Sequence, residues 1–163
     1  MDLHHPWLDP DWQRQIQRLL NSHARWVGTE LIDRSGTAEE QAHRLFDAHF
    51  VVVSHGTQAD PILNSANAMA LLLWAMPLEN FLETPSRLTA EPMHRDERAR
   101  MLAATSRQGY IDDYQGIRIS STGRRFRIDR ATVWNVVDEQ GQPAGQAATF
   151  SEWVFLDSGA TDP

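Results

Sequence analysis

The first 48 residues carry a pattern of apolar and polar side chains with the period of an α-helix. Asp9 and Pro10 suit an N-cap and a first helical position, and a stripe of side chains at helical spacing follows them. The stripe contains Trp12, Ile16, Leu20, His23, Val27 and Leu31. It predicts an amphipathic helix of about six turns, which ends at a polar break over residues 33–36. A capping box over residues 37–40 predicts a second, shorter helix.

The middle of the chain predicts one strand, a short second strand, then short helices and one longer helix. A β-branched run over residues 50–53 predicts the first strand, and turn-forming residues follow it. An apolar run over residues 68–74 begins after Asn67 and is typical of a short buried helix. A longer helix is predicted before Gly109, since acidic residues stand near its start and arginines toward its end, as the helix dipole favours.

The last third of the chain alternates with the period of a β-strand. Tyr114, Gly116, Arg118 and Ser120 alternate with their neighbours, and Phe126, Ile128, Thr132, Trp134 and Val136 are predicted to share one face of the next strand. A final strand over residues 146–156 completes a predicted antiparallel meander. The element order predicts an α+β fold, with a five-stranded antiparallel sheet that carries helices on one face. This is the order of a PAS domain preceded by an N-terminal helical extension.

Several segments resemble the MEKHLA domain family. They are residues 50–57, 60–64, 85–92, 109–114, 116–126 and 145–150. The family is similar to PAS domains and occurs as stand-alone bacterial and algal proteins and as the C-terminal region of plant class-three homeodomain leucine-zipper factors. Because this sequence contains no homeodomain or zipper, the resemblance implies the stand-alone bacterial type, with a PAS-like sensing or dimer-regulating role. We predict a helical extension over residues 1–48, a PAS-like domain over 49–157 and a flexible tail over 158–163.

The composition limits the classes of function. The 163 residues suit one domain, and the net charge of -7 disfavours binding to nucleic acid or anionic membranes. All 15 basic residues are arginines, which leaves bidentate recognition of carboxylate or phosphate possible. The absence of cysteine excludes thiolate catalysis, cysteine-containing zinc sites and flavin-thiol photochemistry. The sequence shows no membrane-spanning run and no signal peptide, so we expect a cytoplasmic protein.

A PAS-type sheet encloses a pocket beneath its helices, and polar side chains among apolar ones mark the candidate ligand contacts. The predicted pocket residues are His55, Asn67, Trp74, Arg87, Met101, Arg118, Phe126 and Trp134. Each has a structural alternative. The aromatic residues fill a core, Asn67 caps its helix, and the arginines form ion pairs on a solvated face.

Cofactor chemistry has little support in the sequence. Haem ligation by His94 is the one cofactor hypothesis that the sequence allows, although Arg95, Asp96 and Glu97 make that region look solvated. The histidines lack the spacing of a metal-ligand cluster, so no metal is expected.

The favoured functional hypothesis is a non-enzymatic sensory or regulatory module that binds a small molecule or a protein partner. The apolar stripe of the N-terminal helix must be buried either on the sheet of the same chain or against a second copy, and we predict a homodimer through this helix. One alternative is an enzyme on a cone-shaped fold of the ketosteroid-isomerase kind, with His55, Asp113 and Tyr114 as acid and base groups. The other is a purely structural interaction protein with a filled core. The downstream partner is not identified by the sequence.

Overall fold

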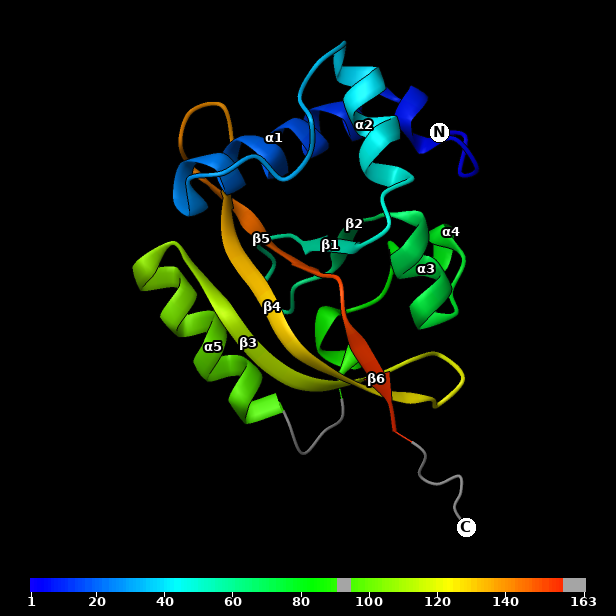
Figure 1. Cartoon of the computed structure of the whole chain (residues 1–163), viewed down its shortest axis with the longest axis vertical. Helices are drawn as coiled ribbons and strands as arrows, with labels where there is room; N and C mark the ends of the chain where they lie inside the picture. Colours follow the sequence, from blue (N-terminus) through cyan, green and yellow to red (C-terminus); the bar gives the residue numbers. More distant parts are fainter. Residues whose placement is uncertain (91–94, 157–163) are drawn as a thin grey trace.

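One antiparallel sheet organises the chain, and helices lie against both of its faces (Figure 1). The computed structural model describes residues 1–90 and 95–156. The predicted tail and His94, the haem-ligand candidate, lie outside these residues. In the described part of the chain, no helix has the length and apolar character needed to cross a membrane.

The strands follow the order β2-β1-β5-β4-β3 across the sheet, and β6 also pairs with β4. Their bounds are β1 (Val51–His55), β2 (Leu63–Ala66), β3 (Tyr110–Ile119), β4 (Arg125–Val137), β5 (Pro143–Phe150) and β6 (Trp153–Phe155). All pairings are antiparallel. Strands β5 and β6 lie one after the other along β4, so the single last strand that the sequence predicted is broken in two. The predicted α+β architecture is confirmed.

The helices form two groups around the sheet. They are α1 (Pro10–Val27), α2 (Ala38–Phe46), α3 (Ala68–Trp74), α4 (Leu78–Phe81) and α5 (Arg95–Gln108), with short 3-10 turns η1 (Pro6–Leu8) and η2 (Ser86–Thr89). Side chains of α3 and α4 pack with Val51 in one apolar cluster, which we call the inner core. Side chains of α1 and α2 pack with Val52 in a second cluster, the outer core. Because Val51 and Val52 are neighbours on β1, the two cores lie on opposite faces of the sheet.

Helix α1 begins where the sequence predicted and ends earlier. The Asp9 carboxylate accepts a hydrogen bond from the Asp11 N–H, and the helix stops at Val27 because Gly28 adopts a left-handed conformation with φ of 87°. The predicted last turn up to Leu31 is therefore wrong. Helix α2 carries the predicted capping box between Thr37 and Glu40.

The apolar stripe of α1 is buried within the chain. Trp12, Ile16 and Leu20 are no more than 6% exposed and belong to the outer core. The Trp134 indole N–H donates to the Leu19 carbonyl at 3.1 Å, and the Val137 N–H donates to the Ser22 hydroxyl at 3.0 Å. Of the two positions that the sequence allowed for the stripe, the sheet of the same chain is the observed one. The stripe is therefore already covered within one chain.

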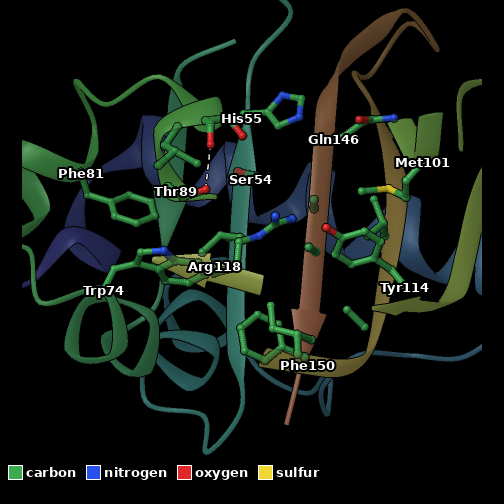
Figure 2. A pocket seen from close by; sticks show the side chains of 18 residues that line it. Ser54, His55, Trp74, Phe81, Thr89, Met101, Tyr114, Arg118, Gln146 and Phe150 are labelled. Atoms are coloured by element: carbon green, nitrogen blue, oxygen red, sulfur yellow. Dashed lines mark hydrogen bonds between the residues drawn. The ribbon is translucent and has the colours of Figure 1, made fainter. Parts of the chain in front are cut away.

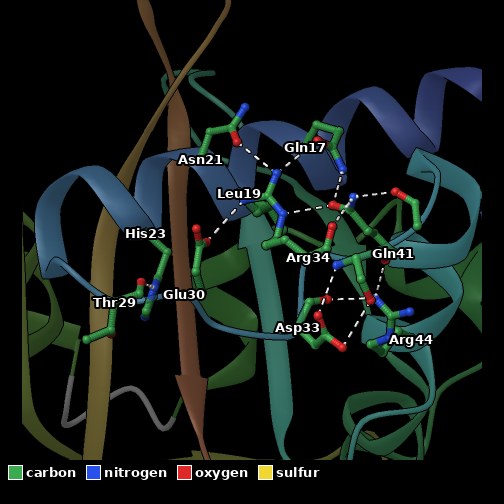
Figure 3. Close-up of polar contacts among 12 residues, drawn as sticks. Gln17, Leu19, Asn21, His23, Thr29, Glu30, Asp33, Arg34, Gln41 and Arg44 are labelled. Carbon is green, nitrogen blue, oxygen red and sulfur yellow. Dashed lines mark hydrogen bonds and ion pairs between the residues drawn. The ribbon is translucent and has the colours of Figure 1, made fainter.

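A polar network fixes α2 and the α1–α2 connection to α1 (Figure 3). The Arg34 guanidinium donates to the side-chain oxygens of Gln17, Asn21 and Gln41 at 2.8–3.0 Å and forms an ion pair with Glu30 at 3.2 Å. Four acceptors on one guanidinium hold three segments in a fixed arrangement. The two N-terminal helices therefore form one unit against the outer face.

The predicted common face of β4 is wrong after Ile128. Phe126 and Ile128 belong to the inner core, whereas Trp134 and Val136 belong to the outer core. Opposite β3, the register shifts between the pairs Tyr114–Ala131 and Gly116–Ile128, which places one extra residue in β4. A β-bulge of this kind exchanges the two faces of the strand beyond it. A strict alternation drawn through the bulge therefore assigned Trp134 to the wrong side.

Candidate functional site

A small cavity lies in the inner core, between the sheet and α3, α4, α5 and η2 (Figure 2). The cavity has a volume of about 60 Å³. One water needs roughly 10–15 Å³ by this measure, and a cavity that holds benzene has about 150 Å³. The cavity thus has room for a few water molecules or a very small ligand, and a larger ligand requires its side chains to move.

The cavity wall is mainly apolar, and none of the described residues that line it is acidic. Its residues are Val53, Ser54, His55, Leu63, Trp74, Phe81, Ser86, Thr89, Met101, Tyr114, Arg118, Ile128, Ala131, Val133, Gln146, Ala147, Ala148 and Phe150. Apolar walls with a few polar groups are typical of small-molecule sites.

Among the described residues of this wall, Arg118 is the one cationic side chain whose charge does not depend on pH. It lies on β3, is 9% exposed and projects between Trp74 and Tyr114 (Figure 2). Its guanidinium carbon is 5.1 Å from the centre of the Tyr114 ring. Its Nη1 is buried and has no hydrogen-bond partner in the part of the chain that the structure describes. A buried charge without a hydrogen-bonding partner is unusual, because its desolvation is costly.

The spacing of β3 places Tyr114 beside Arg118. The two residues are four positions apart on one strand, so their side chains lie on the same face, with Gly116 between them. A Cβ at position 116 would lie 2.4 Å from the Tyr114 hydroxyl oxygen. Glycine therefore leaves the space into which the tyrosine folds. The alternation that the sequence analysis found at residues 114, 116 and 118 is confirmed.

Several other polar side chains of the wall bind neighbouring protein groups. The Ser54 hydroxyl bonds to Asn64 and Ser65, and the Thr89 hydroxyl donates to the Ser86 carbonyl at 2.7 Å. Gln146 donates from its amide to the side-chain oxygen of Asn135 at 2.9 Å. One ring nitrogen of His55, Nδ1, lies 2.9 Å from the Gly56 carbonyl oxygen. These contacts hold the wall in place.

The backbone brings β1 and β5 unusually close at the His55 end of the cavity. Gly145 has φ of 127°, and a Cβ there would lie 1.9 Å from the His55 carbonyl oxygen. Only glycine fits this approach. The pairing of His55 with Gln146, which brings both side chains to the cavity, depends on it.

Four of the eight predicted pocket residues line the cavity, and four do not. The four that do are His55, Trp74, Met101 and Arg118. Phe126 is fully buried in the inner core but does not line the cavity. The centre of its ring lies 5.3 Å from the centre of the Trp74 ring. Trp134 lies on the outer face, beyond the bulge of β4.

Asn67 and Arg87 have the structural roles that the sequence analysis gave as alternatives. Asn67 caps α3 by accepting from the Ala70 N–H at 3.2 Å. Arg87 is an exposed residue whose guanidinium pairs with Asp60 at 3.1 Å. Their assignment to the pocket is wrong, because the polar groups that they bind lie in the protein itself.

The acid and base groups of the alternative enzyme are not assembled. His55 and Tyr114 line the cavity, but Asp113 is exposed and absent from its wall. Among the described residues, no three histidine, aspartate or glutamate side chains cluster as metal ligands do.

The cavity residues that the sequence analysis missed come from segments with no site-like pattern. Thr89 and Ser86 lie in the short turn η2, and Gln146 lies in the predicted last strand, which was not considered as part of the site. Tyr114 was identified, but as a catalytic group of the alternative enzyme. Only the register of β5 with β1 could have placed Gln146 opposite His55.

Comparisons with known proteins agree with the architecture. The sequence matches the MEKHLA domain over residues 13–155, which includes nearly all of α1. It is 30% identical over 100 residues to the homeobox-leucine zipper protein ATHB-9 of Arabidopsis thaliana. That match covers 61% of this chain and 12% of the plant protein, so the chain spans only a small part of that relative.

Solved structures with a similar fold are PAS and light-oxygen-voltage domains. The PAS domain of a Colwellia psychrerythraea protein superposes with a TM-score of 0.60 at 15% identity, covering 68% of this chain and 92% of that one. An RNA-binding light-oxygen-voltage receptor gives 0.58 at 16% identity, over 74% of this chain and 35% of that one. A light-oxygen-voltage domain studied with a flavin analogue gives 0.56 at 13% identity, over 74% and 87%. The chain therefore has the PAS fold.

Proposed function

The chain belongs to the MEKHLA domain family, and we propose that it is a non-enzymatic sensory module that binds a small molecule in the inner-core cavity. The observation that carries the proposal is the buried guanidinium of Arg118, which faces a partly empty and mainly apolar space. A purely structural protein would gain stability by filling this space and by pairing or removing the charge. Location in the bacterial cytoplasm is part of the proposal and rests on the sequence analysis.

The sheet offers a route from the cavity to the N-terminal helices. Val133 lines the cavity, while its neighbour Trp134 donates to the Leu19 carbonyl on α1. Ala147 lines the cavity and also belongs to the outer core. A ligand that displaces β4 or β5 would therefore change the packing of α1. A separate partner protein that contacts α1 or α2 would then respond to whether the cavity holds a ligand.

Filling the cavity is expected to remove ligand binding. We expect purified protein, denatured and analysed by mass spectrometry, to release a bound small molecule, and a library of small metabolites to contain compounds that raise the melting temperature. In Ala131→Val, two added methyl groups occupy the cavity, so we expect the retained molecule and the thermal shift to fall at least about tenfold, at a stability cost of about 1–3 kcal/mol.

Ala144→Val is the matched control, since Ala144 is half-buried in β5 and packs against the outer core. It is expected to keep the retained molecule and the thermal shift. Wild-type protein that retains nothing and responds to no compound would overturn the proposed function.

We also propose a homodimer, formed through an apolar groove beside the N-terminal segment. Leu3, Leu71, Leu72 and Met76 line this groove, and Leu72 is 77% exposed. Sedimentation equilibrium is expected to show a dimer at micromolar concentration and a shift toward monomer in Leu72→Glu. Leu88→Glu changes an exposed leucine outside the groove and serves as the control. A wild-type chain that stays monomeric at high micromolar concentration would contradict the proposal.

A further inference from the structure

We propose that the cavity ligand is a small carboxylate, held by the guanidinium of Arg118 and the indole N–H of Trp74. The inference rests on the proposed function, because it names the chemical class of the molecule that the same cavity binds. It is carried by two buried hydrogen-bond donors that line one cavity and have no acceptor among the described residues.

The first donor is a buried, permanent positive charge. Arg118 is 9% exposed, and a guanidinium stays protonated throughout the physiological pH range. Buried charges in proteins are normally paired, since an isolated one loses its hydration without compensation. In the described part of the chain, Arg118 has the ring of Tyr114 as a neighbour but no carboxylate. The face of an aromatic ring offsets the desolvation cost of a buried cation less than a neighbouring anion would. The cavity therefore favours an anionic occupant.

The second donor is the Nε1–H of Trp74. This residue is 2% exposed, and its indole nitrogen has no hydrogen-bond partner among the described residues. An indole N–H can only donate, so it requires an acceptor. Figure 2 shows the guanidinium of Arg118 directed across the cavity toward Tyr114, with Trp74 on the opposite side. A carboxylate has enough lone pairs to accept from a guanidinium and from a third N–H.

The remaining wall and the volume restrict the rest of the ligand. Much of the remaining wall is apolar and includes Phe81, Met101, Ile128, Val133 and Phe150. These side chains suit a short hydrocarbon tail and offer no hydrogen bonds to the further oxygens of a phosphate. With about 60 Å³ available, the tail is limited to a few carbon atoms. Acetate, propionate and butyrate are therefore the appropriate probes.

The decisive experiment compares each acid with its neutral amide on unmodified protein. Acetate, propionate and butyrate are titrated against acetamide, propionamide and butyramide by isothermal calorimetry at pH 7 and constant ionic strength. Each pair has nearly the same shape, so the difference in affinity reports the charge. We expect the best acid to bind about 10- to 100-fold more tightly than its amide, as a hydrogen-bonded buried charge implies. The indole N–H resonance of Trp74, assigned with Trp74→Phe, is expected to shift when the acid binds.

Variants of Arg118 test whether its guanidinium binds the carboxylate of the ligand. Arg118→Gln is expected to reduce affinity for the best acid at least about tenfold and to leave affinity for its amide within about threefold. Arg118→Lys keeps the charge but lacks the bidentate fork, so an intermediate loss is expected. Arg130→Gln changes an exposed arginine of β4 that does not line this cavity, and is expected to bind like the wild type.

The outcomes separate this inference from the proposed function. Equal binding of acid and amide, or inorganic phosphate binding as tightly as the best acid, overturns the carboxylate and leaves a ligand-binding module. The same holds if no acid binds while a neutral metabolite does. If no compound binds and no molecule is retained, the proposed function fails as well. The acid–amide comparison needs no variant, so a folding defect in Arg118→Gln does not affect it.

Discussion

Trp134→Ala is expected to lower the free energy of unfolding by about 3–5 kcal/mol, the cost of truncating a large aromatic side chain in a core. Trp134 is fully buried, its indole N–H donates to the Leu19 carbonyl, and its ring lies 4.9 Å from the ring of His23. The substitution removes a hydrogen bond and a large buried ring from the interface between β4 and α1. Urea unfolding followed by far-UV circular dichroism measures the loss.

Two further measurements make this prediction specific. Trp153→Ala, at a half-buried tryptophan of β6, is expected to cost less than about 2 kcal/mol, because less of its surface leaves water on folding. Hydrogen exchange in Trp134→Ala should accelerate more for the amides of α1 than for those of β1, if the indole holds the helix to the sheet. A loss below about 1 kcal/mol would show that α1 does not depend on this contact.

His23 lies at the same interface between α1 and β4 and makes its stability depend on pH. Burial lowers the pKa of His23, against the smaller opposing effect of its hydrogen bond with the Thr29 carbonyl. The ring is therefore neutral in the folded protein at a pH at which the unfolded chain is already partly protonated. Its contribution to stability is present above the usual histidine pKa and decreases as the pH falls below that value. The α1 layer is thus bound more weakly in acid.

The sequence predicted the fold where the local signals were strong. The capping box at Thr37, the N-cap at Asp9 and the alternation through Tyr114 and Arg118 each correspond to one physical requirement at one place. Such requirements are met by neighbours in the chain, so periodicity and capping rules detect them. The order of these elements was sufficient for the PAS-like architecture.

The cavity could be predicted only in part, since its wall depends on register and on faces. The bulge in β4 places Trp134 in the outer core. No residue type in that strand is typical of a bulge, so the sequence does not indicate one. Gln146 reaches the cavity because β5 pairs with β1 across 91 positions of sequence, from His55 to Gln146. A pairing between strands so far apart in the sequence is visible only in the assembled sheet and cannot be predicted from local patterns. Arg118 was found because its alternation is local, but its lack of a partner is a property of the fold.

Asn67→Ala is expected to lower the free energy of unfolding by about 3–4 kcal/mol, because the buried amide bonds to four backbone groups from three segments. Its Oδ1 accepts from the N–H groups of Val52 and Ala70, and its Nδ2 donates to the carbonyls of Leu45 and Phe50, at 2.7–3.3 Å. Truncation leaves these groups without the amide in a site that is 2% exposed. Equilibrium unfolding in urea tests the loss, and Asn80→Ala, at an exposed asparagine of α4, should change stability by less than about 0.5 kcal/mol.

Asn67→Ser separates the helix cap from the tether between segments. A serine hydroxyl can still accept from the Ala70 N–H but does not extend to the carbonyls of Leu45 and Phe50. It should therefore recover only about 1 kcal/mol of the loss, the usual value of an N-cap. Since Asn67 does not line the cavity, any ligand that stabilises the wild type should stabilise these variants by a similar amount. If Asn67→Ala instead lost ligand binding and kept its stability, the amide would be a ligand contact and the structural role assigned to it here would be wrong.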